Sequence, residues 1–532
     1  MINTTSRWFA GVAGIAALSC ALAAHGQGQA EPANPIGHFE IARFEVQGNT
    51  LLPAGYIDGL LAPYAGRDRD FGSVQKAVEA LEAAYRDKGY NIVRVVLPEQ
   101  ELNHGVVQLR VIEARIGHVK VEGNQHFDEA NIRHSLPALV EGQTPNVVRL
   151  STELKLANED PAKKTTVQLQ TGERDDQVDA LLQVTDEKPW SAGLVVDNTG
   201  DENTGRNHVS VMMQNANVGG VDHVLSLQYT TSFAEPGNVH IFGAGYHLPL
   251  YTLGDSLDFY GSYSDVNAGT INVGVGVDLA VSGKGSVVGG RYNHNLLKVG
   301  DYESKVMLGF DYKDFQNDVS ADGTALGNHV TVHPLSLTYA GTWSPIGSVL
   351  SFYVSGFRNI PGGSNGGSAD FSAARGGATD NYSLLRYNAT YLKALPQDWQ
   401  LRFVLNGQIT SDALVQGEQF GAGGVNSVRG FLEREIANDE GRTTNLELYT
   451  PNVCSGGAQC RLLGFYDTGY ISRNDALAGE ITSQSIGSIG LGARLVRAPY
   501  IVVQADAAHV VDGTALSPKG SNRVHFRVVL TY

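Results

Sequence analysis

The sequence predicts a mainly β protein, a sixteen-stranded transmembrane β-barrel preceded by two small α+β domains. From residue 190 to residue 532, segments of about ten residues alternate apolar and polar side chains, the length and period of a membrane-spanning strand. Helical periodicity is absent from this region. The chain also has 63 glycines among its 532 residues, which suits hairpins and barrel bends. A large secreted β-sandwich or propeller is the soluble alternative, but no blade repeat is visible.

The start of the chain is typical of a secretory signal peptide, predicted over residues 1–23. An apolar run from Trp8 to Leu22 follows a short basic segment and leads into small residues suited to cleavage. Cys20 would allow lipidation, although Ala17 is a poor residue three places before a lipidated cysteine. A short linker, 24–38, shows no helical period, and no later apolar run is long enough to predict a membrane-spanning helix.

An internal repeat defines the two small domains, which we place at 39–114 and 115–188. In each domain an alternating strand ends in a Gly-Asn pair, which readily takes positive φ: Gly48-Asn49 in the first and Gly123-Asn124 in the second. Helical segments and then two strands follow, so each domain is predicted to have the order β-α-α-β-β.

Local signals place the elements of these domains. A helix is expected over 73–88, with Gly89 at the C′ position, and another helix after Thr144-Pro145. The strands that follow the helices are expected near 93–97, 106–112, 166–171 and 177–185.

The region from 189 to 532 forms the predicted barrel. The clearest alternation is at 208–214, 223–229, 305–312, 349–357, 400–405 and 523–532. The glycine-rich segment 271–280 is assigned to a loop, because bacterial single-chain barrels usually have an even number of strands. In the last strand Phe526 and Tyr532 share one face, and we interpret this aromatic end as a barrel signal.

A long glycine-rich stretch, 412–443, interrupts the strand pattern, and a loop of this length is more often functional than a plain connector. Its centre, Val428-Arg429-Gly430-Phe431, places one cation among apolar residues. Burying such a cation is costly unless a carboxylate meets it.

A partner for this cation is found downstream, in the strand-like segment that contains Gly464, Phe465 and Asp467. Because the strand period is two, Phe465 and Asp467 fall on one face. If Asp467 faces the barrel lumen, a bidentate pair with Arg429 would hold the loop inside the barrel. The alternative is an exposed loop arginine and an aspartate that faces pore water.

Other residue patterns bear on a disulfide, a catalytic serine and metal binding. Cys454 and Cys460, in a chain that leaves the cytoplasm, favour a local disulfide over a metal site. The spacing Gly362-x-Ser364-x-Gly366 matches a serine-hydrolase elbow, but no strand–turn–helix context is expected, and we interpret it as a flexible surface loop. The 15 histidines lack ligand spacing. We therefore expect no catalytic site, metal or cofactor and conclude that the protein is not an enzyme.

The formal net charge of −16 and the pI near 5.4 argue against nucleic acid as a partner. No motif indicates a small-molecule substrate.

The repeated strand-Gly-Asn-helix pattern resembles POTRA domains, and the region behind it carries Val-Arg-Gly-Phe and Gly-Phe-Tyr-Asp. Together these features resemble the translocators of two-partner (type V) secretion, the ShlB/FhaC/HecB family of haemolysin secretion and activation proteins. The resemblance extends from about residue 39 to residue 532. It implies a sixteen-stranded barrel in the Gram-negative outer membrane, in contact with its lipid, with both POTRA domains in the periplasm. It also implies export of a large, mostly β-helical, haemolysin- or adhesin-like exoprotein, which is bound in extended form.

The resemblance also implies roles for individual residues. The long loop would fold back into the barrel, where Arg429 meets Asp467. By the strand order, Cys454 and Cys460 would bracket a periplasmic turn. Family members often begin with a helix that plugs the barrel, and the short, non-helical linker 24–38 makes such a helix doubtful here.

Two other functions remain open on the sequence. A barrel assembly or insertase factor of the same superfamily usually carries more POTRA domains than two. A passive porin belongs to a different class and has no need of paired periplasmic domains.

Overall fold

The computed structural model describes residues 38–101, 103–202, 205–237, 239–265, 269–272, 278–281, 284–316, 320–321, 324–325 and 329–532. The predicted signal peptide and all but the last residue of the linker 24–38 lie outside the described residues, as does any segment that would form a plug helix.

The first small domain has the predicted β-α-α-β-β order with two short strands added, β1 and β3, which are not consecutive in the chain. Its elements are β1 (Phe39–Ile41), β2 (Arg43–Gln47), α1 (Ala54–Leu61), η1 (Ala62–Tyr64), β3 (Gly66–Arg69), α2 (Phe71–Asp87), β4 (Arg94–Val96), η2 (Asn103–Gly105) and β5 (Val106–Ile112). The sheet order is β2-β5-β4, with β2 and β5 parallel, while β1 pairs with β3 in a separate sheet. Gly89 ends α2 with φ +90°, because the last turn requires a left-handed residue there.

The second small domain repeats this plan without the two added strands. Its elements are β6 (Arg115–Glu122), α3 (Glu129–His134), α4 (Val147–Ala157), β7 (Lys163–Thr171) and β8 (Gln177–Asp186), in the sheet order β6-β8-β7. The side chains of Asp128 and Asn146 cap α3 and α4. A buried apolar cluster holds the helices to the sheet and includes Ile116, Phe127, Ile132, Leu150 and Leu182.

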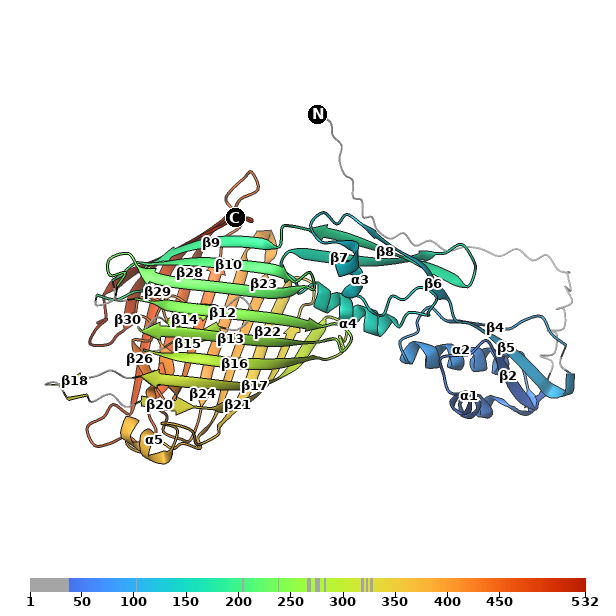
Figure 1. Cartoon of the computed structure of the whole chain (residues 1–532), viewed down its shortest axis with the longest axis horizontal. Helices are drawn as coiled ribbons and strands as arrows, with labels where there is room; N and C mark the ends of the chain where they lie inside the picture. Colours follow the sequence, from blue (N-terminus) through green and yellow to red (C-terminus); the bar gives the residue numbers. More distant parts are fainter. Residues whose placement is uncertain are drawn as a thin grey trace, which may run out of the picture. The chain divides into compact units, whose positions relative to one another are not determined.

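The rest of the chain forms a closed antiparallel barrel, which confirms the predicted fold class (Figure 1). Its strands are β9 (Trp190–Asp197), β10 (His208–Val218), β11 (His223–Ser232), β12 (Ile241–Leu250), β13 (Asp255–Asp265), β16 (Lys284–Asn295), β17 (Tyr302–Gln316), β20 (His329–Val332), β21 (Pro334–Trp343), β22 (Ser348–Asn359), β23 (Ser383–Ala394), β24 (Gln400–Ile409), β27 (Glu440–Tyr449), β28 (Gln459–Ser472), β29 (Ser483–Arg497), β30 (Ile501–Asp512) and β31 (Asn522–Thr531). The last strand, β31, pairs with β9 and closes the barrel.

Two of these labelled segments, β20 and β21, are parts of one strand, so the barrel has sixteen. Both pair with β17, one after the other along its length. The interruption falls at His333, just before Pro334, which has no N–H to donate to a ladder. The His333 N–H instead donates to Asn359 Oδ1 at 2.6 Å.

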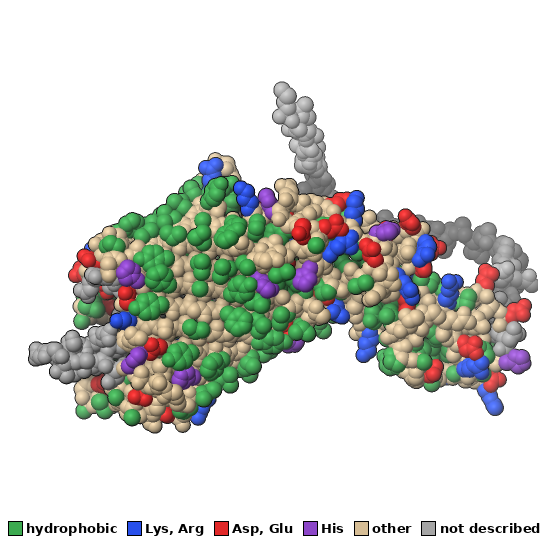
Figure 2. All heavy atoms as spheres, in the orientation of Figure 1, with side chains coloured by type: hydrophobic (Ala, Val, Ile, Leu, Met, Phe, Trp, Pro, Cys, Tyr) green, Lys and Arg blue, Asp and Glu red, His purple; other side chains and the backbone are tan. Residues whose placement is uncertain are grey.

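The two faces of the barrel wall differ in polarity, as the alternating sequence predicts. Exposed large side chains of the wall are apolar, among them Val211, Leu227, Phe242, Phe259, Leu308, Leu337, Leu446 and Leu491. Figure 2 shows hydrophobic side chains spread over the visible face of the barrel. Buried polar side chains alternate with them, among them Ser210, Ser226, Thr230, Ser262, Ser336, Thr338, Thr443 and Asn445. This arrangement is the one expected of a barrel with a polar lumen in lipid. Across the described residues, no helix combines the length and the apolar character needed to cross a membrane.

Several short elements lie outside the ladder of the barrel. The strands β14 (Gly269–Asn272) and β15 (Asp278–Val281) pair only with each other, so the described ends of segment 271–280 are not part of the barrel, in agreement with its assignment to a loop. The strands β18 (Ser320–Ala321) and β19 (Thr324–Ala325) also pair with each other, and η3 (Pro396–Asp398) lies in the turn before β24.

The sequence shows no helical periodicity after residue 190, yet the described residues of this region include one short α-helix, α5 (Ser368–Ala374). Asp370 caps this helix by accepting the Gly367 N–H at 3.0 Å, and the segment is too short for a helical period to be visible. The preceding residues 362–366 are held against β20, where Thr331 Oγ1 donates to the Ser364 carbonyl at 2.6 Å.

Candidate functional site

The long loop between β24 and β27 contributes the centre of the site. It contains η4 (Gln416–Glu418) and a short hairpin of β25 (Phe420–Ala422) and β26 (Ile436–Asn438). The residues between these two strands form the tip, and Gly423 and Gly424 begin it with φ of +112° and +105°. Such angles favour glycine and let the chain reverse direction there.

Arg429 lies at this tip and is 2% exposed. Its Nε donates to Asp467 Oδ2 at 2.7 Å and its Nη2 donates to Asp467 Oδ1 at 2.8 Å, in a bidentate pair. The Arg429 backbone N–H also donates to Asp467 Oδ2 at 3.1 Å. The sequence left open whether Arg429 meets Asp467 or lies exposed, and the structure brings the two residues together with Asp467 fully buried.

Two further carboxylates reach the same guanidinium from other strands. Glu447 Oε1 of β27 lies 2.9 Å from Arg429 Nη2, and Asp506 Oδ1 of β30 lies 3.3 Å from Nη1. Outer arginines pair with these acids in turn, Arg402 with Glu447 at 2.9 Å and Arg494 with Asp506 at 2.9 Å. Three cations therefore face three anions, and this balance compensates for the desolvation of the buried charges.

The ring of Phe465 completes the contact, because its centroid lies 3.5 Å from Arg429 Cζ. Phe465 and Asp467 thus share one face of β28, as the two-residue period predicts. The adjacent Gly464 is on the opposite face, where an added Cβ would meet open space.

Gly430 lets the tip approach the barrel wall closely. Its φ is +97°, and an added Cβ would lie 3.3 Å from both Ala508 Cβ and Val510 Cγ2. Its backbone N–H donates to His525 Nε2 of β31 at 2.9 Å. Glycine is required here for both its conformation and its lack of a side chain.

Val428 and Phe431 flank the charged centre and are fully buried. They belong to an apolar cluster that also includes Ala422, Ile436, Ile471, Ile486 and Val510. The four-residue motif therefore combines one ion cluster with two apolar contacts, and it seats the tip against five consecutive strands of the wall, β27 to β31.

Glu418, at the end of η4 near the start of the long loop, makes a second buried contact with the wall. Its Oε1 accepts from Lys313 Nζ at 2.7 Å, and its Oε2 accepts from Arg386 Nη2 at 3.1 Å. Glu418 is 1% exposed, so the two cations compensate for its burial.

The other residues that the sequence singled out lie away from this cluster. Gly48 and Gly123 have φ of +83° and +88°, and Asn49 closes its turn by accepting the Leu52 N–H at 3.0 Å. Asn124 closes the equivalent turn by donating to the Phe127 carbonyl at 2.8 Å. These pairs are turn residues.

Cys454 and Cys460 form a disulfide with a Cα–Cα distance of 5.2 Å. Cys454 lies in the turn after β27 and Cys460 is the second residue of β28, at the end of the barrel opposite the long loop. Phe526 of β31 is paired with Ala505, and Tyr532, just after β31, exchanges backbone hydrogen bonds with Ala192 of β9 at 2.9 and 3.0 Å.

Sequence reasoning missed Glu447, Asp506, His525 and Glu418. The one available signal was parity, since each acid of the strands occupies an inward position of an alternating segment. Within the described residues, no group of three or more His, Cys, Asp or Glu side chains is placed to hold a metal ion.

Known proteins share this architecture. The sequence profile of the family described as "Haemolysin secretion/activation protein ShlB/FhaC/HecB" matches residues 177–495, which is more than half of the chain. The chain belongs to this family. A second profile, "POTRA domain, ShlB-type", matches residues 39–114.

Relatives in the same family match most of the chain. The heme/hemopexin transporter protein HuxB of Haemophilus influenzae (strain 86-028NP) is 20% identical over 471 residues, covering 85% of this chain and 80% of that protein. The outer membrane transporter CdiB of Escherichia coli O6:K15:H31 (strain 536 / UPEC) is 24% identical over 422 residues, covering 77% and 68%.

Solved structures support the fold. CdiB from Escherichia coli superimposes with a TM-score of 0.73 at 20% identity, covering 94% of this chain and 92% of that one. BamA from Haemophilus ducreyi lacking POTRA domains 1–3 gives a TM-score of 0.50 at 15% identity.

This ShlB/FhaC/HecB member is therefore an outer-membrane transporter of two-partner secretion, which acts with a large secreted exoprotein, and its POTRA domains lie in the periplasm. The short turns of the barrel, including the one closed by Cys454–Cys460, then face the periplasm. By the strand order, the long loop and the α5 connection lie at the opposite, extracellular end.

Proposed function

We propose that the exoprotein is bound in extended form by the POTRA domains and passes through the barrel lumen, with the Arg429 loop as the element that must yield. The single observation that carries this proposal is the cluster of three cations and three anions that seats the loop tip against the wall. Ion pairs in a polar lumen can exchange partners with water or with a passing chain, whereas a covalent or purely apolar seal cannot.

The edge of β7 is the proposed binding site for the extended exoprotein. β7 is the longer, uninterrupted edge of the sheet β6-β8-β7, and its exposed side chains from Thr166 to Gln170 are polar. The other edge, β6, is covered by the α3–α4 connection, because Val119 N–H donates to Glu141 and Gly142 N–H donates to the Ile116 carbonyl. An extended chain adds to an uncovered edge through main-chain hydrogen bonds.

Secretion assays test the role of the loop. The readout is the large protein that disappears from the medium when this chain is deleted. Arg429→Ala and Asp467→Ala should each abolish or strongly reduce its secretion while the barrel still folds. The matched control is Arg442→Ala, because Arg442 is exposed on β27. Within the described residues its side chain contacts only the ring of Tyr470, whose centroid lies 5.4 Å from Arg442 Cζ. Full secretion by both loop variants would contradict the proposal.

Cross-linking tests whether the exoprotein binds along the edge of β7. A photoreactive cross-linker on a cysteine at Gln168 of β7 should capture the exoprotein, and the same cross-linker at Lys120 of β6 should not. Equal capture at both positions would contradict pairing along β7. A barrel-assembly role, the alternative left open by the sequence, predicts instead that deletion lowers the amounts of other outer-membrane barrels.

A further inference from the structure

A second buried arginine, Arg375, meets the long loop at its outer end. Arg375 directly follows α5, whose last turn fixes its backbone by a hydrogen bond from the Arg375 N–H to the Phe371 carbonyl at 2.9 Å. Its side chain is 8% exposed and forms a bidentate pair with Asp439, which is fully buried at the end of the loop. Burying such a pair costs desolvation free energy, which good pair geometry and further hydrogen bonds must offset.

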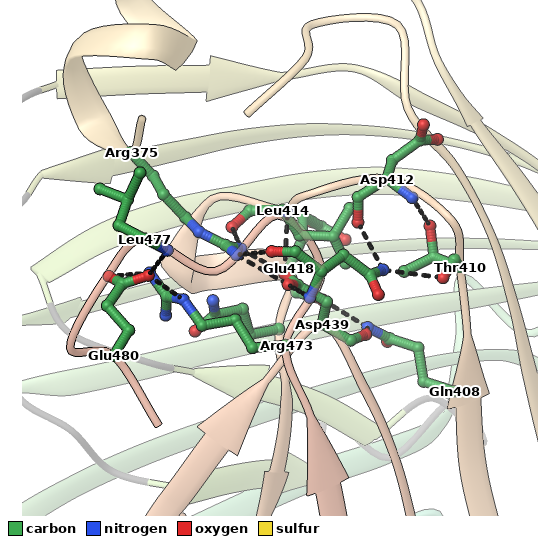
Figure 3. A network of polar contacts seen from close by, with 12 residues as sticks. Arg375, Gln408, Thr410, Asp412, Leu414, Glu418, Asp439, Arg473, Leu477 and Glu480 are labelled. Carbon is green, nitrogen blue, oxygen red and sulfur yellow. Dashed lines mark hydrogen bonds and ion pairs between the residues drawn. The ribbon is translucent and has the colours of Figure 1, made fainter. Parts of the chain in front are cut away.

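Three extracellular connections meet at this pair, as Figure 3 shows. Arg375 comes from the β22–β23 connection and also donates to the Leu414 carbonyl at 2.7 Å, at the start of the long loop. Asp439, at the end of the same loop, accepts the Leu414 N–H at 2.9 Å. The β28–β29 connection joins through Asn474, whose carbonyl accepts from Arg375 at 3.0 Å and whose N–H donates to Asp439 at 2.8 Å. We call this set of contacts the outer junction.

An apolar cluster adjoins the outer junction at Leu414. Phe371 of α5 and Tyr382 are fully buried in a cluster that also contains Val330, Val332, Ala378, Leu384, Leu414 and Val415. This cluster joins β20, the α5 connection and the start of the long loop. Because a low-dielectric surrounding strengthens a charge-assisted hydrogen bond, the Arg375–Asp439 pair is a strong fastening.

Neighbouring charges in the same region do not have this character. Arg473 pairs with Glu480 at less than a third exposure of either side chain, but both belong to the β28–β29 connection. That pair closes one loop on itself, and Figure 3 shows it beside the outer junction. Arg473 is therefore a matched control for Arg375, because its ion pair stays within one loop.

We propose that Arg375 is a positioning residue that fastens the outer end of the long loop to the α5 connection, independently of the Arg429 cluster at the tip. The loop is then held at both ends of its path into the lumen, and either fastening alone leaves the extracellular mouth partly open. The two fastenings share no residue, so loss of Arg375 loosens the mouth while the Arg429–Asp467 pair remains.

The full chain in a planar lipid bilayer tests this proposal, with the potassium chloride current at fixed voltage as the readout. No exported protein is used, so the result is independent of the proposed function. Arg375→Met should raise the mean current at least about threefold, because removal of one partner of a buried pair destabilises the closed arrangement. Arg375→Lys keeps the charge but cannot bind in bidentate fashion and should give a smaller rise. Arg473→Met should leave the current unchanged.

A covalent bridge across the outer junction provides the decisive arm. Ala378 and Ala413 are partners in an isolated β-bridge between the two segments, a separation that a disulfide can span. In the Arg375→Met background, oxidised Ala378→Cys/Ala413→Cys should return the current to the parent value, and dithiothreitol should raise it again. Parent protein with dithiothreitol controls for reduction of Cys454–Cys460.

Heat-modifiable mobility on gels establishes that each barrel is folded. If Arg375→Met does not fold, the proposal is tested instead by the current of Arg375→Lys, measured with and without the disulfide of Ala378→Cys/Ala413→Cys. An unchanged current in the folded variants would overturn the proposal. A raised current that persists after the bridge has formed would overturn it as well, since fastening would then not be the role of Arg375.

Discussion

The most informative perturbation of the loop tip is Asp467→Asn, which keeps the shape of the side chain and removes its charge. The change replaces a carboxylate that accepts three hydrogen bonds from Arg429 and one from Asn445, at 2.7 to 3.1 Å. It also leaves the cluster with three cations and two anions. Breaking a buried pair costs about 3–5 kcal/mol, and we expect the lower end because Glu447 and Asp506 remain beside Arg429.

A loss of about 3 kcal/mol corresponds to an increase of roughly a hundredfold in the population of the detached tip. The Gly430 N–H reports this state, since it is bonded to His525 when the tip is seated. Hydrogen exchange measured by mass spectrometry on the full chain should therefore accelerate by about that factor in peptides that cover the tip.

Asp506→Asn is the graded comparison, because Asp506 contributes one bond to Arg429 at 3.3 Å. Its effect on exchange at the tip should be smaller. Unchanged exchange at the tip in folded Asp467→Asn would refute the reasoning. An equal acceleration in β28–β29 peptides would refute it too, since the effect would then be global.

Two further predictions concern the tip and the second POTRA domain. Gly430→Ala should detach the tip at a cost of about 1–3 kcal/mol, because φ is +97° and the new Cβ would lie 3.3 Å from Ala508 and Val510; faster exchange at the tip checks it, and parent-like exchange contradicts it. Burial raises the pKa of Glu153 to about 6, against the hydrogen bond from the Ala138 N–H. Because the folded-state pKa is above the ordinary value, stability falls as pH rises from about 4 to about 6. Glu153→Gln should therefore stabilise α4 at pH 7.5 by of order 1 kcal/mol, seen as about fivefold slower exchange of its amides, with little difference at pH 5. Faster exchange at pH 7.5 would mean that the Arg149 contact at 3.6 Å outweighs the burial.

Much of the fold was predictable because its signals are local. Period-two alternation distinguishes the barrel strands, and glycine beside asparagine marks the repeated turn of the small domains. The break at His333 and the short helix α5 were not predictable. The break depends on which neighbouring strand lies opposite the missing N–H of Pro334, and that pairing is set by the fold. The helix α5 is stabilised by burial of Phe371 in a cluster assembled from three segments.

The sequence by itself determined the barrel, its long loop, the local disulfide partners and one nominated contact, Asp467, because each follows from neighbouring residues or from strand parity. Only the tertiary structure decided what surrounds Arg429. Glu447 and Asp506 lie 18 and 77 residues from it in sequence, and their approach depends on the register of β27, β28 and β30 around the closed wall. The same holds for Arg375 and Asp439, which are 64 residues apart. Charges that face each other across a barrel are brought together by closure, and closure is a property of all sixteen strands at once.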